Sequence, residues 1–291
     1  MMRAPILYLA VAVAAPIYGG QVCPYMEGLP VWEFEGYVAL PMAIILGLRL
    51  ALHPVYVKAA PMIERSHRQF KLDMGLFTLA GLGTSLLLHL VLDFPLWQMG
   101  YKLTLSFITG GLFASLDMAL DQERKSIYKS IENPDSLLPP SKVMPRSRMF
   151  ALVAISITGL SILIVLLMIL RDFNWLAQQP ADVRDFHGAI NSVVIEVLLV
   201  MGVLLAFSMN LIFSVARNLR ILFKLETSAL ESISRGDLSV HVPVATQDEL
   251  GYIAGVTNTM ILKLRDHLRL RRGLDIAAEV QQNFLPESAP E

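Results

Sequence analysis

The chain has 291 residues, of which 54% are hydrophobic and only 17% are charged, and its mean hydropathy is +0.54. Soluble globular proteins are typically about 45–50% apolar and about 25% charged, so this composition favours a membrane protein. With a formal net charge of −1 we expect no nucleic-acid partner, and a single cysteine, Cys23, excludes an internal disulfide and a cysteine-rich metal site.

Five segments approach the roughly 20 apolar residues that a membrane-spanning helix needs. They are residues 36–53, 74–92, 103–120, 149–170 and 189–214. A shorter sixth segment, residues 4–18, is either an uncleaved span or a cleaved signal peptide, and the absence of a clean cleavage site after it favours the span. The sequence therefore predicts six transmembrane helices in a domain covering residues 1–214.

Lysine and arginine are unevenly distributed among the short loops between these segments. Loops 54–73 and 121–148 carry ten of them, whereas the alternate loops carry three. Cytoplasmic loops are enriched in these residues, so the two basic loops are predicted to be cytoplasmic. Six spans then place both termini in the cytoplasm, as in a multi-pass protein of the bacterial inner membrane. The loop at 121–148 is interpreted as a linker without core-forming capacity.

Charged residues at membrane depth are costly, so each is a candidate functional group. Glu196 and His89 lie at similar depths near the outer leaflet, and a Glu196–His89 pair is a candidate for intramembrane sensing. The alternative is an ordinary packing contact or a snorkelling side chain. Arg49 and Asp117 lie near the cytoplasmic ends of their spans, where they could pair, but we expect them to snorkel.

The chain is expected to remain helical after the last span. Apolar residues recur over 218–234 at the spacing of a coiled-coil seam, and Gly236 is typical of a helix C-terminus. The apolar seam residues are Leu219, Leu222, Ala229 and Ile233, and Glu226 also occupies a seam position.

A second helix is predicted after an extended connector in which valines alternate around Pro243. Asp248 and Glu249 place negative charge where the dipole of a new helix favours it. The second seam consists of Leu250, Ile253, Thr257, Met260 and Leu264. Two such helices cannot bury their seams alone, so we expect two copies of the chain to form a parallel four-helix bundle.

This layout resembles a HAMP domain, the relay module of bacterial receptors. The resemblance lies in Gly236-Asp237-Leu238, Asp248-Glu249-Leu250-Gly251 and Asn258-Thr259-Met260. It implies a relay over residues 215–268 in which the signal passes through Leu222, Glu226, Gly236, Asp237, Leu238, Asp248, Glu249, Gly251, Asn258 and Met260. The family usually has a proline where this chain has Leu222, which suggests a straighter join between membrane and bundle.

Residues 269–291 are predicted to be a helical linker. The string AAEVQQNFLPESAP resembles the entry to SpoIIE-like, metal-dependent serine/threonine phosphatases, with Gln281, Leu285 and Pro286 matching and Phe284 replacing a leucine. The resemblance implies a phosphoprotein substrate and Mn²⁺ or Mg²⁺ held by aspartates of an output domain absent from this chain. The chain itself is then expected to be a fragment without catalytic residues or cofactors.

We therefore interpret the chain as an all-α membrane protein: six spans in the bilayer, a HAMP relay that forms a homodimer, and a linker to a phosphatase. A membrane-bound class III adenylate cyclase is the alternative, because such cyclases share the six-span layout. A histidine kinase is disfavoured because Leu268, not glutamate, follows His267. A pure transporter is disfavoured by the relay.

Overall fold

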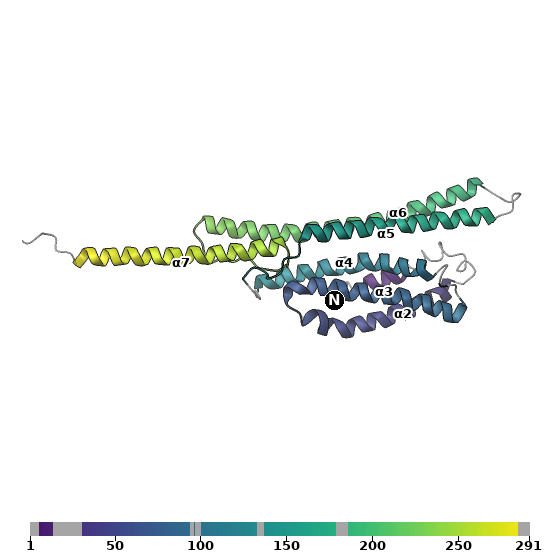
Figure 1. The fold of residues 1–291 in the computed structure, drawn as a ribbon, viewed down its shortest axis with the longest axis horizontal. Coiled ribbons are helices and arrows are strands. Elements are labelled where there is room, and N and C mark those ends of the chain that lie inside the picture. Colours follow the sequence, from purple (N-terminus) through teal and green to yellow (C-terminus); the bar gives the residue numbers. More distant parts are fainter. Residues whose placement is uncertain are drawn as a thin grey trace, which may run out of the picture. The chain divides into compact units, whose positions relative to one another are not determined.

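The computed structural model describes residues 6–13, 31–93, 96, 100–132, 137–178 and 186–284. All regular secondary structure in these ranges is helical, so the predicted all-α class is confirmed for this part of the chain (Figure 1). Besides a helical segment at 6–13, the principal helices are α2 (Val31–His53), α3 (Arg65–Leu92), α4 (Tyr101–Glu132), α5 (Arg146–Gln178), α6 (Phe186–Ser234) and α7 (Glu249–Phe284). Two short helical turns, η1 (Pro54–Lys58) and η2 (Met62–Glu64), connect α2 to α3.

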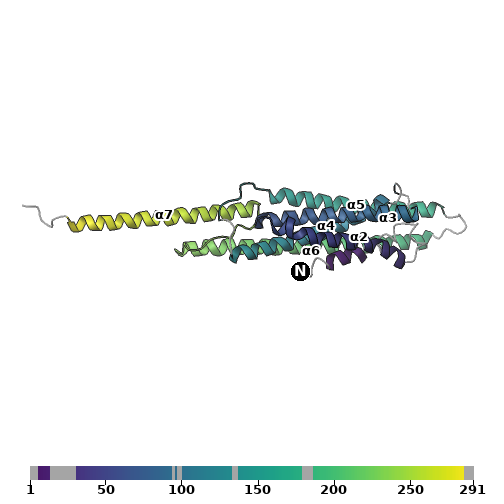
Figure 2. The same cartoon turned by 90° about the horizontal axis from the view of Figure 1, so that it is seen from below.

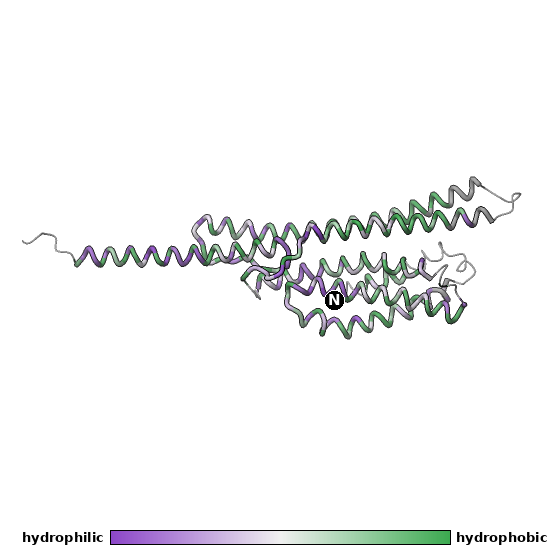
Figure 3. Tube along the Cα trace, in the orientation of Figure 1, coloured by the Kyte–Doolittle hydropathy of each residue, from purple (hydrophilic) through white to green (hydrophobic). Residues whose placement is uncertain are grey.

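Within the described residues, five helices are long and apolar enough to cross a membrane, and each contains most or all of a predicted span. The stretches are Glu35–Lys58, Met62–Leu92, Tyr101–Glu132, Arg146–Leu170 and Val193–Ser234. Figure 3 shows long apolar stretches along much of α5 and along the middle of α6, whereas α7 alternates between polar and apolar residues. Residues 4, 5 and 14–18 of the sixth candidate lie outside the described residues, so the count of six stays a prediction.

The chain divides into two compact units. The membrane unit comprises Met1–Ser126 and Arg146–Asn218, and the C-terminal unit comprises Ile127–Pro145 and Leu219–Glu291. The C-terminal unit thus contains residues 219–268 of the predicted relay, together with the end of α4 and the segment before α5. The loop at 121–148 is therefore not merely a linker, because α4 extends to Glu132 and Ile127 is completely buried.

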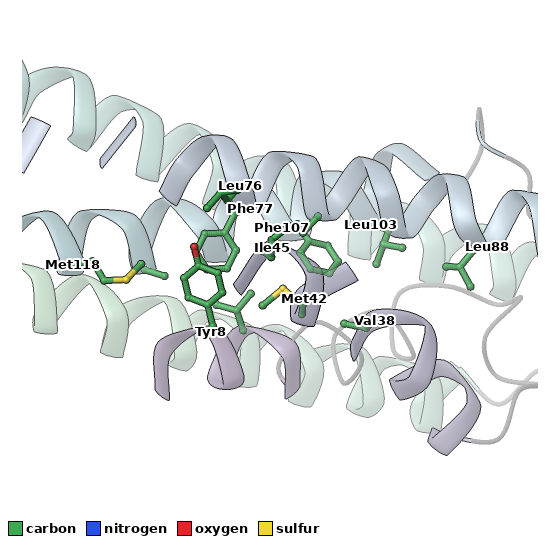
Figure 4. Close-up of a cluster of buried hydrophobic side chains, with 13 residues drawn as sticks. Tyr8, Val38, Met42, Ile45, Leu76, Phe77, Leu88, Leu103, Phe107 and Met118 are labelled. Atoms are coloured by element: carbon green, nitrogen blue, oxygen red, sulfur yellow. The ribbon is translucent and has the colours of Figure 1, made fainter. Parts of the chain in front are cut away.

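The core of the membrane unit joins α2, α3 and α4 with the helical segment 6–13 (Figure 4). Tyr8 lies against Phe77, with ring centroids 4.5 Å apart, and both side chains are buried. Burying an aromatic side chain contributes about 1.5–3 kcal/mol in soluble proteins, and in a bilayer the same close packing acts through dispersion contacts. The segment 6–13 is therefore an integral part of this helical core.

Candidate functional site

Helix α6 leads from the apolar stretch into the C-terminal unit without a break. It is a single helix of 49 residues, Phe186–Ser234, labelled α6 in Figure 1 and Figure 2. Leu222, which stands where the resemblance to HAMP domains would place a proline, is buried against Ile127 and Ala245. A proline inside a helix removes a backbone hydrogen bond and kinks the helix. The leucine instead leaves the backbone hydrogen bonds of α6 intact at this level, as the straighter join expected from the sequence requires.

The end of α6 is fixed by Gly236, as predicted. Its φ of +86° belongs to the left-handed region, and the amide of Asp237 donates to the carbonyl of Ser232 at 3.0 Å. Together with the bond from the Gly236 amide to the Ile233 carbonyl (2.9 Å), this is a Schellman motif. This cap ends α6, and the chain continues from it into the connector.

The Asp237 carboxylate stabilises the turn that follows. It accepts hydrogen bonds from the hydroxyl (2.6 Å) and the amide (2.9 Å) of Ser239. These bonds lower the pKa of Asp237 below its ordinary value. They favour the charged form, so their contribution is present at neutral pH and is lost as the pH falls through the folded-state pKa. The next residue, Leu238, accepts a hydrogen bond from the Arg265 guanidinium on α7 through its carbonyl.

The start of α7 is capped by Asp248. Its Oδ1 accepts hydrogen bonds from the amides of Leu250 (3.1 Å) and Gly251 (3.2 Å) and from the Thr246 hydroxyl (2.6 Å). This satisfies two of the amides that a helix N-terminus leaves without a partner. A Cβ at Gly251 would lie 1.9 Å from the Thr246 carbonyl oxygen, so this tight entry requires glycine. Glu249 follows as the first helical residue, where its charge suits the helix dipole.

Asn258 holds the connector against α7. Its Oδ1 accepts from the Val242 amide (2.7 Å) and its Nδ2 donates to the Val242 carbonyl (2.8 Å). The connector is buried here, and Val242 and Val244 pack between Ala229 of α6 and Ala254 of α7. The Asn258 side chain thus replaces a missing strand partner for an extended backbone.

Glu226 is paired, which explains a polar residue on the first seam. It accepts a hydrogen bond of 2.6 Å from the hydroxyl of Thr257, a polar residue on the second seam. The two helices therefore face each other at this level through a matched polar contact. Buried polar groups are tolerated when they have such partners.

The predicted second seam lies at the edge of the face that α7 buries within the chain. The buried side chains include those of Ala254, Thr257, Asn258 and Ile261, whereas Ile253 (47% exposed) and Met260 (41% exposed) lie outside this face. Sequence periodicity alone missed Ala254 and Ile261. The exposed apolar edge of α7 has no covering element among the described residues.

In the membrane unit, the snorkelling prediction for Arg49 is wrong. Its guanidinium is buried, and Nε lies 2.7 Å from Oδ1 of Asp73, whose side chain is fully buried. The Tyr8 hydroxyl (3.0 Å) and the Gln69 side-chain amide also donate to Asp73. Asp73 falls within the predicted loop 54–73, but α3 begins at Arg65 and carries Asp73 into the core.

Asp117 is also buried rather than snorkelling, and it accepts a hydrogen bond of 3.1 Å from Asn210 on α6. Further along α4, Arg124 donates to Ser214 and Asn218, each at 3.0 Å. Asn210, Ser214 and Asn218 recur every four residues, which places them along one face of α6. This polar row was not recognised in the sequence, although polar residues at such spacing in an apolar helix are a detectable signal.

Two sensing candidates remain predictions. His89 lies near the C-terminal end of α3 and is half-buried. Glu196 lies along α6, but its side chain is outside the described part of the structure. No group of three or more His, Cys, Asp or Glu side chains that could hold a metal ion occurs in the described residues. Residues 285–291, with Leu285 and Pro286 of the phosphatase-like string, also lie outside them.

Comparison with known proteins identifies the membrane part of the chain. The MASE10 family model, which describes a membrane-associated sensor domain, matches residues 7–199, more than half of the chain. The chain belongs to the MASE10 family. The MASE10 match includes most of the helical segment 6–13 and ends before the C-terminal part of α6, the connector and α7.

The MASE10 chain is also similar to a cyclic di-GMP phosphodiesterase of Vibrio cholerae, with 24% identity over 257 residues. The alignment covers 88% of this chain and 50% of the relative, so the chain spans about half the length of the curated relative that it matches. No solved structure matches the chain. The protein is therefore a multi-pass membrane sensor related to a cyclic di-GMP signalling protein.

Proposed function

We propose that the chain is the receptor and relay part of a bacterial membrane signalling protein, in which α6, the connector and α7 form a HAMP-type relay. The observation that carries the proposal is the unbroken helix α6, which passes from an apolar stretch into a capped joint. At that joint Asn258 and Arg265 bind the connector to α7. A rotation or shift of α6 would therefore move α7 through hydrogen bonds and packed side chains.

The relay acts as a homodimer. Ile253 and Met260 lie on the exposed apolar edge of α7, and Phe223 and Leu230 are exposed apolar residues on α6. Coiled-coil helices bury such positions against a partner helix. A second copy would cover this edge and complete a parallel four-helix bundle.

A cysteine at Met260 tests the dimer. With Cys23 replaced by serine, Met260→Cys is expected to form an intermolecular disulfide in membranes under mild oxidation. The reason is that a seam residue at position 260 would face residue 260 of the second protomer. Lys263→Cys, an exposed position on the same helix, is the matched control and should crosslink much more slowly. Gel mobility without reductant measures the outcome. Faster crosslinking at position 263 than at position 260, or no crosslinking at either position, would contradict the seam assignment.

The membrane topology follows from the basic loops. We infer an inner-membrane protein with both termini in the cytoplasm, and with residues 4–18 retained as a sixth span. Support for retention comes from Tyr8, which is buried in the core of the membrane unit and hydrogen-bonded to Asp73.

Two output activities are proposed for the whole protein. The string AAEVQQNFLPESAP at residues 277–290 favours a metal-dependent serine/threonine phosphatase that acts on a phosphoprotein, with Mn²⁺ or Mg²⁺ bound outside this chain. The similarity to the Vibrio cholerae protein favours hydrolysis of cyclic di-GMP instead. Assays of the full-length protein with a phosphoserine peptide and with cyclic di-GMP separate the two, since each activity leaves the other substrate intact.

A further inference from the structure

A third chain segment is built into the proposed relay. Residues 137–145, which we call the strap, precede α5 and belong to the C-terminal unit with α7 and the connector. The strap carbonyl of Leu137 accepts a hydrogen bond of 3.1 Å from Asn258, and the amide of Met144 donates to the Gln247 carbonyl at 2.7 Å. The strap therefore contacts both α7 and the connector.

Gly255 permits the closest of these contacts. A Cβ at this position would lie 2.3 Å from the backbone nitrogen of Pro139 and 2.4 Å from its Cα. Both distances are much shorter than van der Waals contact. Because both atoms belong to the backbone, a side chain at position 255 would have to displace the strap itself. Gly255 and Asn258 are three residues apart, on the same face of α7. The lack of a side chain at Gly255 therefore leaves room on this face of α7 for the backbone of the strap.

Chain connectivity couples the strap to the membrane unit. It follows α4, whose residue Ile127 is buried against Leu222 of α6, and it leads directly into α5. Arg146, the first residue of α5, is bound to Glu123 of α4 at 2.5 Å. Only Pro145 separates Arg146 from Met144, so the start of α5 cannot move far without disturbing the bond from Met144 to Gln247.

We propose that the strap is a second input to the relay, in addition to α6, and that its docking on α7 holds the relay in one signalling state. The proposal rests on the relay function proposed above. Movement of the α4 and α5 ends would withdraw Pro139 from Gly255 and release the connector at Gln247. The relay would then integrate motion arriving through α6 with motion arriving through the loop between α4 and α5.

Two variants of the full chain in nanodiscs displace the strap by different means. Gly255→Ala places a Cβ against Pro139, and Gly273→Ala, where nothing lies within 4 Å of the added Cβ, is the matched control on the same helix. Met144→Pro removes the amide donor, and Met144→Ala, which keeps it, is its control. Each variant also carries Met260→Cys in the background without Cys23.

Hydrogen exchange of peptide 137–145 and the rate of disulfide formation at position 260 are the two measurements. Gly255→Ala should speed exchange of the Met144 amide by roughly ten-fold, as expected when a hydrogen-bonded contact opens. Met144→Pro has no amide at position 144 to follow, so its readout is the crosslinking rate, which both variants should change severalfold. The two controls should do neither.

Three other outcomes would contradict, in turn, the second input, the docking of the strap on α7 and the dimeric relay. Faster exchange with an unchanged crosslinking rate would show that the strap is a passive cover, which overturns the second input while leaving the relay intact. Unchanged exchange of the Met144 amide in Gly255→Ala would mean that the strap does not dock on α7. Absence of the crosslink at position 260 when Met260→Cys is the only change besides the loss of Cys23 would refute the dimeric relay itself.

Discussion

Inserting two residues after Arg271 is expected to lock the output of the full-length protein, whereas inserting seven preserves its regulation. The site lies within α7, which continues as one helix from Glu249 to Phe284 through Gly273. A helix turns about 100° per residue, so two residues rotate the downstream face by about 200° and seven return it to within about 20°. If α7 transmits its orientation, only the two-residue insertion turns the downstream face away and locks the output.

The measurement is the output activity of both insertion proteins over the range of conditions in which the unmodified protein is regulated. An unregulated two-residue insertion beside a regulated seven-residue insertion supports transmission through a rigid helix. Regulation that survives both insertions would mean that α7 is a flexible tether beyond Arg271, and the relay proposal would fail at this joint.

Removing either partner of the Arg49–Asp73 pair is expected to cause the largest loss of stability in the membrane unit. Both side chains are nearly or fully buried, with 10% and 0% of their surface exposed. Breaking a buried pair leaves an uncompensated charge and typically costs about 3–5 kcal/mol. Arg49→Met and Asp73→Asn should therefore each lower the folded fraction in detergent, as measured by thermal unfolding. The double variant should recover part of the loss, since no lone charge remains.

The pair between Arg68 and Glu64 is the matched control. It has a similar distance of 2.8 Å, but its side chains are 36% and 37% exposed. Exposed pairs contribute about 0–1 kcal/mol, so Arg68→Met should shift the unfolding temperature little. Equal effects of Arg49→Met and Arg68→Met would contradict the buried cluster.

The helical elements were predictable because their signals are local. Long apolar stretches predict the five described helices that are long and apolar enough to cross a membrane. Gly236 predicts the end of α6, and Asp248 predicts the start of α7. Each of these features depends on a few neighbouring residues and on backbone requirements that only certain side chains satisfy. The C-terminal cap and the N-terminal cap lie within one or two residues of their predicted positions.

The tertiary contacts were less accessible to the sequence. Arg49 and Asp73 are 24 residues apart in the chain. The position of Arg49 near the cytoplasmic end of its predicted span favours snorkelling and gives no sign of the pairing with Asp73. Gly255 has no distinctive local pattern, and its role depends on Pro139, more than 100 residues earlier. Glu226 interrupts the apolar seam in the sequence, and only the structure places Thr257 opposite it. Such contacts depend on the three-dimensional approach of segments, which periodicity does not specify.

In the proposed relay, a change in the membrane unit reaches the distal part of α7, and paired spin labels at position 274 measure this effect directly. Leu274 is 71% exposed and lies beyond the joint. Asn210→Leu removes the hydrogen bond from α6 to Asp117, and Ile212→Leu, at an exposed apolar position of the same helix, is the control. In nanodiscs, we expect Asn210→Leu to shift the distribution of distances between the two labels of the dimer, while Ile212→Leu should leave it unchanged. Identical distributions in the unmodified protein and in Asn210→Leu would show that the change does not reach the distal part of α7.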